Sequence, residues 1–121
     1  MTSSELQSRF KQFAYRVVSV CEQLPPQKIS SVIEHQVLRS SFSAAANYRA
    51  ACKGISRKAF IAKLSIAFEE IDESLFWLEC ILDLKLHPVK KMEAIIREAS
   101  ELASILASAR KTSQLQNNIK S

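Results

Sequence analysis

Residues 56–86 read SRKAFIAKLSIAFEEIDESLFWLECILDLKL and contain neither glycine nor proline. Apolar residues recur in this stretch at steps of three or four: Phe60, Leu64, Ala67, Phe68, Ile71, Leu75, Leu78 and Leu82. That spacing is the period of an α-helix with one apolar face. Ser56 supplies a hydroxyl of the kind that favours a helix N-terminus. The stretch therefore predicts one long helix over residues 57–86.

Further apolar residues widen this helix beyond a single face: Ile61, Ile66, Phe76, Trp77 and Ile81. Two interpretations stay open. The helix is either the most buried element of the monomer, or Phe76 and Trp77 pack against another subunit. Large aromatic side chains are enriched in subunit interfaces, so Phe76 and Trp77 are the candidate oligomer interface.

Three breaks divide the rest of the chain into further helices: Pro25-Pro26, Gly54 and His87-Pro88. The whole sequence holds one glycine and three prolines, which argues against an all-β or loop-rich protein. Apolar residues again recur at steps of three or four between the breaks. The predicted helices are 3–24, 30–53, 57–86 and 89–112, followed by a polar tail over 113–121.

Two of the predicted helix starts carry capping boxes, in which a hydroxyl residue precedes a glutamate by three positions. These are Thr2 with Glu5 and Ser31 with Glu34. The connections between helices are short, so consecutive helices should lie antiparallel. The sequence of 121 residues predicts one all-α domain over 1–121, an up-down-up-down antiparallel four-helix bundle.

Composition fits a water-soluble domain, with 47% hydrophobic and 24% charged residues. No stretch approaches the roughly 18 apolar residues of a membrane span. The polar N-terminus lacks the apolar centre of a signal peptide, so we expect a cytoplasmic protein without a membrane partner. Three cysteines, Cys21, Cys52 and Cys80, lie far apart and form no CxxC pattern. We expect them to be small buried hydrophobic residues and not zinc ligands.

No motif for catalysis is present: the chain has no glycine-rich phosphate loop and no nucleophile motif. One helix carries a run of carboxylates: Glu69, Glu70, Asp72 and Glu73. Ferritin-like metal sites also need Glu-x-x-His motifs, and neither His35 nor His87 follows a glutamate at that spacing. We therefore predict no enzyme activity, no cofactor and no metal site.

The net charge of +5 is unevenly distributed along the predicted bundle. The antiparallel order brings ten of the 17 lysines and arginines to one end: Arg9, Lys11, Arg49, Lys53, Arg57, Lys58, Lys63, Arg110, Lys111 and Lys120. Glu5 is the acid expected beside them. Helix dipoles favour cations at a helix C-terminus but disfavour Arg57 and Lys58 at a helix start. This local cost points to a polyanionic partner, and the alternative is a solvated basic end.

The candidate nucleic-acid contacts are six of these bases: Arg49, Lys53, Arg57, Lys58, Arg110 and Lys111. Aromatic residues near the basic segments, Tyr48 and Phe60, fall on the apolar stripes. The pattern therefore predicts contacts to phosphates and not stacking on bases.

A row of polar residues, Arg39, Ser43 and Asn47, follows one face of the second predicted helix at steps of four. Glu70 and Glu73 on the third helix are placed to face it. We interpret the five residues as a structural polar network inside the bundle, and a catalytic role is the alternative.

Sequence on two of the predicted helices resembles a known family. Residues 37–52 read VLRSSFSAAANYRAAC, residues 60–67 read FIAKLSIA, and residues 72–79 read DESLFWLE. Arg-Ser-x-x-Ser-x-x-x-Asn and Asp-Glu-Ser-x-x-Trp-Leu follow in this order, as in helices two and three of the bacterial four helix bundle protein family. That family includes proteins encoded in intervening sequences of 23S ribosomal RNA genes. Ala45 departs from the glycine that many members carry there.

The resemblance implies a four-helix bundle that assembles into a ring-like homopentamer. It also implies kinship with accessory proteins of diversity-generating retroelements, which are basic pentamers that bind nucleic acid and a reverse transcriptase. Our first hypothesis is a non-enzymatic homo-oligomer that binds RNA or DNA. The alternative is a protein-interaction scaffold or accessory subunit that docks a protein partner and has no direct nucleic-acid role.

Overall fold

The chain folds into four helices in the computed structural model, which describes residues 1–120 except the side chains at positions 117, 119 and 120. The helices are α1 (Ser3–Glu22), α2 (Lys28–Ala51), α3 (Arg57–Asp83) and α4 (Val89–Lys120). The prediction of an all-α protein is confirmed. None of the helices in the described part of the chain has an apolar stretch long enough to cross a lipid bilayer.

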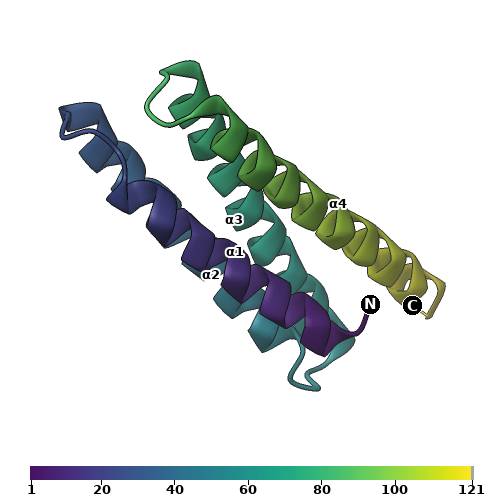
Figure 1. The fold of residues 1–121 in the computed structure, drawn as a ribbon. Helices are drawn as coiled ribbons and strands as arrows, with labels where there is room; N and C mark the ends of the chain where they lie inside the picture. The colour runs from purple at the N-terminus through teal and green to yellow at the C-terminus, as the bar shows by residue number, and fades with distance from the viewer. Residues whose placement is uncertain (121) are drawn as a thin grey trace.

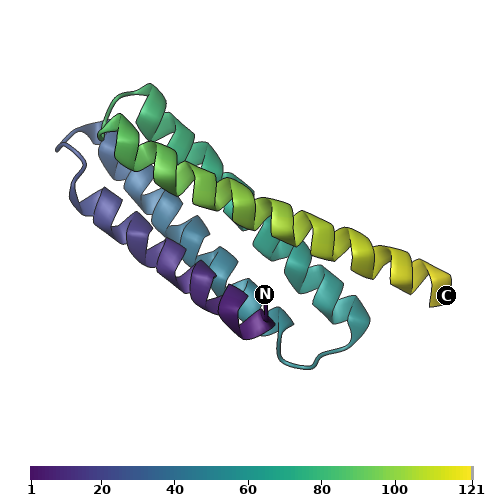
Figure 2. The ribbon, with the colours of Figure 1, turned by 45° about the vertical axis from the view of Figure 1, so that its right-hand side comes forward.

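Consecutive helices run antiparallel, as the short connections predict (Figures 1 and 2). The chain start, the α2–α3 connection and the last turns of α4 lie toward the same end of the bundle. α3 packs against both α2 and α4, α1 packs against α2, and α1 packs more loosely against α4. The order of packing is that of an up-down four-helix bundle.

Local side-chain chemistry starts two of the helices where the sequence predicts. The Glu5 backbone N–H donates to Thr2 Oγ1 at 3.1 Å, and the Thr2 N–H donates to Glu5 Oε2 at 3.2 Å, which completes the capping box. Ser56 Oγ accepts from the Ala59 N–H at 3.2 Å at the start of α3.

The second predicted capping box is wrong, because α2 begins at Lys28 with Gln27 as its uncapped N-cap. The Gln27 N–H donates to the Pro25 carbonyl at 2.8 Å, which turns the chain directly after the two prolines. Ser31 already donates its N–H to the Gln27 carbonyl at 3.4 Å. Its hydroxyl therefore lies within the first turn and caps nothing.

The predicted polar tail is also wrong over residues 113–120, because α4 continues to Lys120. Ser113 is buried against the bundle, and Gln116 Oε1 accepts a hydrogen bond from Arg57 Nη1 at 2.6 Å. No glycine or proline interrupts these residues, so the helix can continue, and the contacts with α3 stabilise its last turns. Residue 121 lies outside the described residues.

α3 ends at Asp83, three residues before its predicted end. The Leu86 N–H donates to the Ile81 carbonyl at 3.0 Å and the Lys85 N–H donates to the Leu82 carbonyl at 3.0 Å. These two bonds form a Schellman motif, which places its C′ residue in the left-handed region. Lys85 takes that position with φ 57°, and the turn brings Leu86 into the core.

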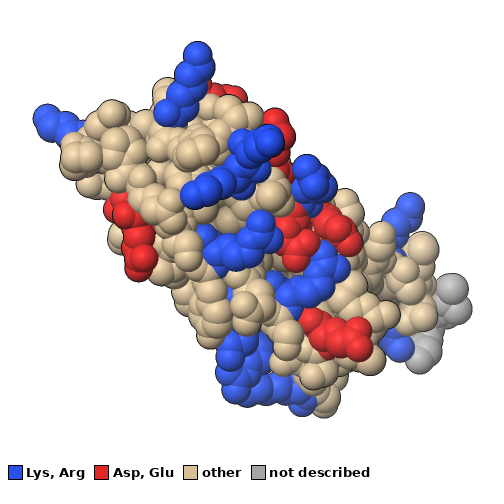
Figure 3. Space-filling view, in the orientation of Figure 1, with Lys and Arg blue, Asp and Glu red and all other residues tan. Residues whose placement is uncertain are grey.

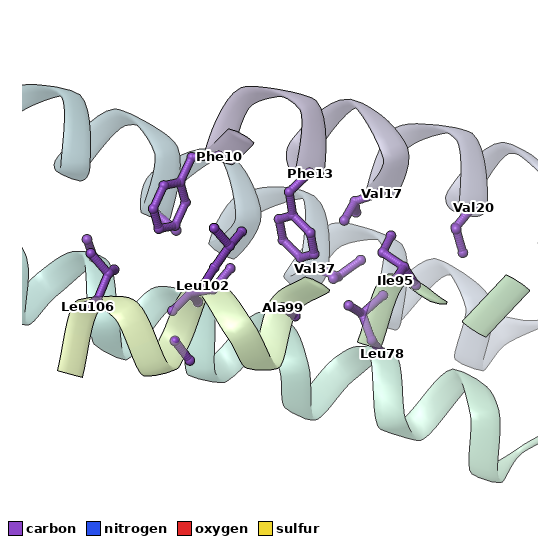
Figure 4. Packing of buried hydrophobic residues seen from close by; sticks show 14 of the residues in the cluster. Phe10, Phe13, Val17, Val20, Val37, Leu78, Ile95, Ala99, Leu102 and Leu106 are labelled. Atoms are coloured by element: carbon purple, nitrogen blue, oxygen red, sulfur yellow. The ribbon is translucent and has the colours of Figure 1, made fainter. Parts of the chain in front are cut away.

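The core lies along the axis where the four apolar faces meet (Figure 4). Phe10 of α1 stacks on Tyr48 of α2 with ring centroids 5.3 Å apart. Larger side chains fill the rest of the axis: Phe13, Ile33, Leu64, Ile71, Leu78, Met92, Leu102 and Leu106. α2 presents small buried residues toward its neighbours: Ser40, Ser41 and Ala44. Ser40 Oγ lies 2.7 Å from Ser74 Oγ, so α2 and α3 approach closely at this point.

Candidate nucleic-acid interface

The six predicted nucleic-acid contacts lie in the half of the bundle that contains the α2–α3 connection. Arg49 is in the last turn of α2, Lys53 is in the connection, and Arg57 and Lys58 are the first two residues of α3. Arg110 and Lys111 belong to α4, whose C-terminal part runs beside the start of α3 (Figure 2).

None of these six bases forms an ion pair within the described part of the chain, where the ion pairs are made by Arg9 and Arg39. Arg57 donates to the neutral amide of Gln116. The Arg110 guanidinium lies over the Phe68 ring, 5.2 Å from its centroid. The six charges are therefore fixed by neutral partners or face solvent, and they stay available to an external anion.

The six bases do not form one compact cluster. Arg110 contacts Phe68, which lies about 16 Å along α3 from Arg57 at 1.5 Å per residue. The two bases are separated because α4 is longer than predicted, so that Gln116 and not Arg110 lies opposite the start of α3. Arg49 lines a groove between α1 and α2 together with Lys11. The bases therefore surround one half of the molecule.

The charge separation is smaller than the sequence predicts. Arg9 Nη2 pairs with Glu98 Oε1 at 2.6 Å and with Glu101 Oε1 at 3.4 Å, whereas the sequence predicts Glu5 as the acid beside these bases. The hydrogen bonds that Arg9 donates to Glu98 raise the pKa of Arg9. Figure 3 shows bases clustered at the lower end and mixed with acids over the middle of the face. The Lys120 side chain lies outside the described residues.

The predicted polar network divides into two separate groups. Arg39 Nη1 donates to Glu70 Oε2 at 2.8 Å, and Arg39 Nη2 donates to Glu73. These hydrogen bonds, the one to Glu73 first, raise the pKa of Arg39. Asn47 Nδ2 donates instead to the Ser43 carbonyl at 2.9 Å and to Ser43 Oγ at 3.2 Å. The structure brings Arg39 to the two glutamates but leaves Ser43 and Asn47 to each other.

The position of this network corrects the expectation of a network inside the bundle. The Arg39 side chain is 44% exposed and the Glu73 side chain is 35% exposed, so the ion pairs lie at the surface. Long side chains allow charged groups to reach water from a helix–helix seam. The buried polar contact is the hydroxyl pair of Ser40 and Ser74, both 0% exposed. The sequence indicates that Ser74 is buried, because Ser74 lies three residues after Ile71 and four residues before Leu78 on the apolar stripe of its helix.

Phe76 and Trp77 have different surroundings. Phe76 is 55% exposed, whereas Trp77 packs partly against the core and donates its indole N–H to Glu73 Oε2 at 3.1 Å. Their rings meet edge to face with centroids 5.0 Å apart. Phe76 is therefore accessible to another subunit, and Trp77 belongs mainly to the α3 surface of its own bundle.

A second exposed aromatic pair was missed by the sequence analysis. Tyr15 of α1 is 47% exposed and Phe42 of α2 is 42% exposed, and their ring centroids lie 6.3 Å apart. They line a mainly apolar groove of about 230 Å³ together with Lys11 and Arg49. The residues lie on different helices, so only the rotation of α1 against α2 brings them together.

The acidic, histidine and cysteine side chains were candidates for metal binding and for nucleophilic chemistry. The described residues contain no group of three His, Cys, Asp or Glu side chains placed to hold a metal ion. The three cysteines are free thiols. Burial raises the pKa of the Cys21 thiol to about 12, so it stays protonated at neutral pH and is a poor nucleophile.

Comparison with known proteins relates the chain to a bacterial family. Residues 3–108 match the family described as 23S rRNA-intervening sequence protein. A crystal structure of a protein of unknown function from the S23 ribosomal protein family of Bacteroides thetaiotaomicron is also similar. It has 32% sequence identity and a TM-score of 0.80, over 88% of this chain and 98% of that one. No curated protein matches the chain.

Proposed function

The chain belongs to the 23S rRNA-intervening sequence protein family, and we propose that it is a non-enzymatic, homo-oligomeric nucleic-acid-binding protein. It contacts phosphates of RNA or DNA through the basic half of the bundle. The candidate contacts are Arg49, Lys53, Arg57, Lys58, Arg110 and Lys111. The family resemblance suggests five subunits.

One observation carries the proposal: six bases in one half of the bundle lack a carboxylate partner in the described part of the chain. Arg57 and Lys58 stand at the start of α3, where the helix dipole disfavours cations. A phosphate backbone offsets that cost, because each neutralised phosphate releases condensed counterions.

The spread of these bases favours an extended ligand. Arg110 lies about 16 Å along α3 from Arg57, which exceeds the spacing of neighbouring phosphates in one strand. A nucleic acid that lies across this half of the bundle meets several bases in turn. Oligomerisation repeats the surface in each subunit, and repeated weak contacts raise the overall affinity by avidity.

The test is removal of charge at the start of α3. We expect Arg57→Gln with Lys58→Gln to weaken RNA or DNA binding and to lower the salt slope by about 2 for each bound subunit. The matched control is Lys85→Gln with Lys90→Gln, which removes two charges at the opposite end. Equal losses from the two pairs would mean that only net charge matters and would sink the site assignment. Circular dichroism checks that helicity is unchanged.

A second candidate function, a protein-interaction scaffold, is favoured by the groove between α1 and α2. Its exposed Tyr15 and Phe42 offer apolar area of the kind that protein partners cover. This candidate predicts that a partner protein still binds after nuclease treatment and is lost in Phe42→Ser. Binding that survives in Phe42→Ser removes the groove from consideration.

A further inference from the structure

A separate cleft lies between α1 and α4, toward the end of the bundle opposite the basic half. Its volume is about 270 Å³, and its polar lining comprises Arg16, Ser19, Gln23, His87 and Lys91. α1 packs less closely against α4 than α3 packs against its neighbours. Small residues such as Ser19 and Ala94 leave space between the two helices at this level. None of the lining residues belongs to the proposed nucleic-acid interface.

His87 is the unusual residue of this cleft. It is 7% exposed, yet its imidazole makes no hydrogen bond within the described part of the chain. The buried side-chain atom without a hydrogen-bond partner among the described residues is Ser30 Oγ, so the unpaired ring nitrogens of His87 are open to the solvent of the cleft and can bond an external group. The ring lines the cleft, so a bound group there reaches it.

Two cations share the cleft with His87. Arg16 and Lys91 are exposed, and neither takes part in an ion pair among the described residues. No aspartate or glutamate lines the cleft. Figure 3 shows basic side chains mixed with acidic ones along the face between α1 and α4, and the acidic ones lie outside the cleft lining. The cleft is therefore a cationic surface without its own counter-charge.

The start of α4 adds to the positive character of this place. Pro88 directly precedes the helix, and its side chain cannot accept a hydrogen bond from the first N–H groups of α4. Its backbone carbonyl accepts a hydrogen bond from the Lys91 N–H at 3.1 Å. The first N–H groups of a helix and its dipole favour an anion. Lys91 lies in the same first turn, so charge and dipole act in the same direction.

We propose that this cleft binds the phosphate group of a phosphorylated ligand, with Arg16 and Lys91 as charge partners and the His87 N–H as a hydrogen-bond donor. Both a cation pair and a neutral donor suit a phosphate, whose oxygens accept several hydrogen bonds. A volume of about 270 Å³ exceeds the space of the phosphate alone and admits part of the attached molecule. The phosphate belongs either to a small molecule or to a nucleic acid strand. The proposal does not depend on the basic half.

The charge state of His87 agrees with this arrangement and provides a readout. Burial, and then the charge of Lys91, lower the pKa of His87. A bound phosphate adds negative charge beside the ring and favours the protonated form. Binding therefore raises the pKa of His87.

The experiment is an NMR titration of the histidine ring signals with inorganic phosphate, adenosine monophosphate and a short single-stranded RNA lacking terminal phosphates, at constant ionic strength. The chain has two histidines, and the exposed His35 is the internal control. We expect a saturable shift and a raised pKa at His87 and no change at His35. A response to phosphate or the nucleotide identifies a small-molecule site, and a response to RNA alone identifies a strand phosphate.

Matched variants separate this site from general charge. We expect Lys91→Gln and Arg16→Gln each to weaken binding about tenfold or more, since each removes a charged hydrogen bond. Lys90→Gln removes the same charge one residue away, outside the cleft lining, and should leave binding unchanged. An unmoved His87 signal with all three ligands, or equal effects of Lys90→Gln and Lys91→Gln, overturns the proposal. Either result leaves the function of the basic half untouched, because that half is tested by variants at Arg57 and Lys58.

Discussion

At the scale of single residues, Lys85 holds the one non-glycine backbone with positive φ among the described residues, at 57°. The left-handed conformation costs a residue with a Cβ about 1–2 kcal/mol. Lys85 accepts it because the turn after α3 buries Leu86 and closes two backbone hydrogen bonds. Packing therefore decides this turn against local preference.

We predict that Lys85→Gly raises the free energy of unfolding by about 0.5–1 kcal/mol, since glycine adopts this conformation without steric cost. Urea denaturation measures the change. Lys85→Ala is the control, because it removes the side chain but keeps the Cβ. A stabilisation of equal size in Lys85→Ala would trace the effect to the lysine charge and not to the backbone.

His87 should make stability depend on pH. Its pKa in the folded chain lies below the ordinary 6.5 because of burial and Lys91. Above pH 6.5 the ring is neutral in both states and makes no difference. As pH falls below 6.5, the unfolded chain takes up the proton first. The free energy of unfolding therefore decreases until the pH passes below the pKa of His87 in the folded chain.

The measurement is denaturation between pH 5 and pH 8 for the natural chain, His87→Gln and His35→Gln. We expect the natural chain and His35→Gln to lose stability together as pH falls, and His87→Gln to lose less. Parallel curves for the natural chain and His87→Gln would contradict the assignment of His87 as a buried neutral ring.

At the scale of helices, small residues set how closely α2 approaches α3. Ser40 and Ser74 are 0% exposed and their hydroxyls lie 2.7 Å apart. Ser74 Oγ also donates to the Glu70 carbonyl at 3.0 Å within its own helix. The pair therefore satisfies two hydroxyls in the core and leaves no room for larger side chains.

We predict that Ser40→Ala and Ser74→Ala each destabilise the bundle by about 1 kcal/mol, and that the double variant costs less than the sum. A double-mutant cycle by urea denaturation gives the coupling. Ser41→Ala is the control, since its hydroxyl donates to the Leu38 carbonyl within α2 and touches no hydroxyl of α3. Additive costs would mean that the hydroxyl pair contributes no coupling energy.

The helices were predictable from sequence to the extent that local chemistry determines them. The Thr2 and Ser56 caps are confirmed because each needs only residues of its own first turn. The ends of α2 and α4 were not predictable in this way. A backbone turn at Pro25 starts α2, and contacts of Ser113 and Gln116 with the bundle extend α4.

The candidate site was predictable in its residues but not in its arrangement. The antiparallel order is enough to assign Arg57 and Lys58 to one end. The pairing of Arg9 with Glu98 depends on how α1 and α4 are rotated about their own axes. The apolar stripes give that rotation only approximately. The same limit concealed the Tyr15–Phe42 groove, because its two rings come from different helices.

At the scale of the whole molecule, exposed aromatic side chains are the surfaces that assembly would cover. Phe76 is 55% exposed on α3. We predict that the 13.6 kDa chain has a several-fold larger mass in solution, five-fold if the family resemblance extends to assembly. Phe76→Ser should shift that mass toward the monomer, while Leu115→Ser, another exposed apolar position, should not.

Light scattering after size exclusion measures these masses across protein concentration. Oligomers of unchanged mass in Phe76→Ser would exclude Phe76 as an interface residue. A monomer in the natural chain at all concentrations would contradict the homo-oligomer proposal itself.

The central claim is that the basic half of the bundle binds nucleic-acid phosphates, and the most direct test is binding of the natural chain to labelled RNA and double-stranded DNA across a salt series. We expect binding at low salt, and the logarithm of the binding constant should fall linearly with the logarithm of the salt concentration, with a slope of about −0.7 to −0.9 per phosphate contacted. Several contacts per subunit give a steep slope. No binding at low salt, or binding that salt leaves unchanged, would contradict the claim.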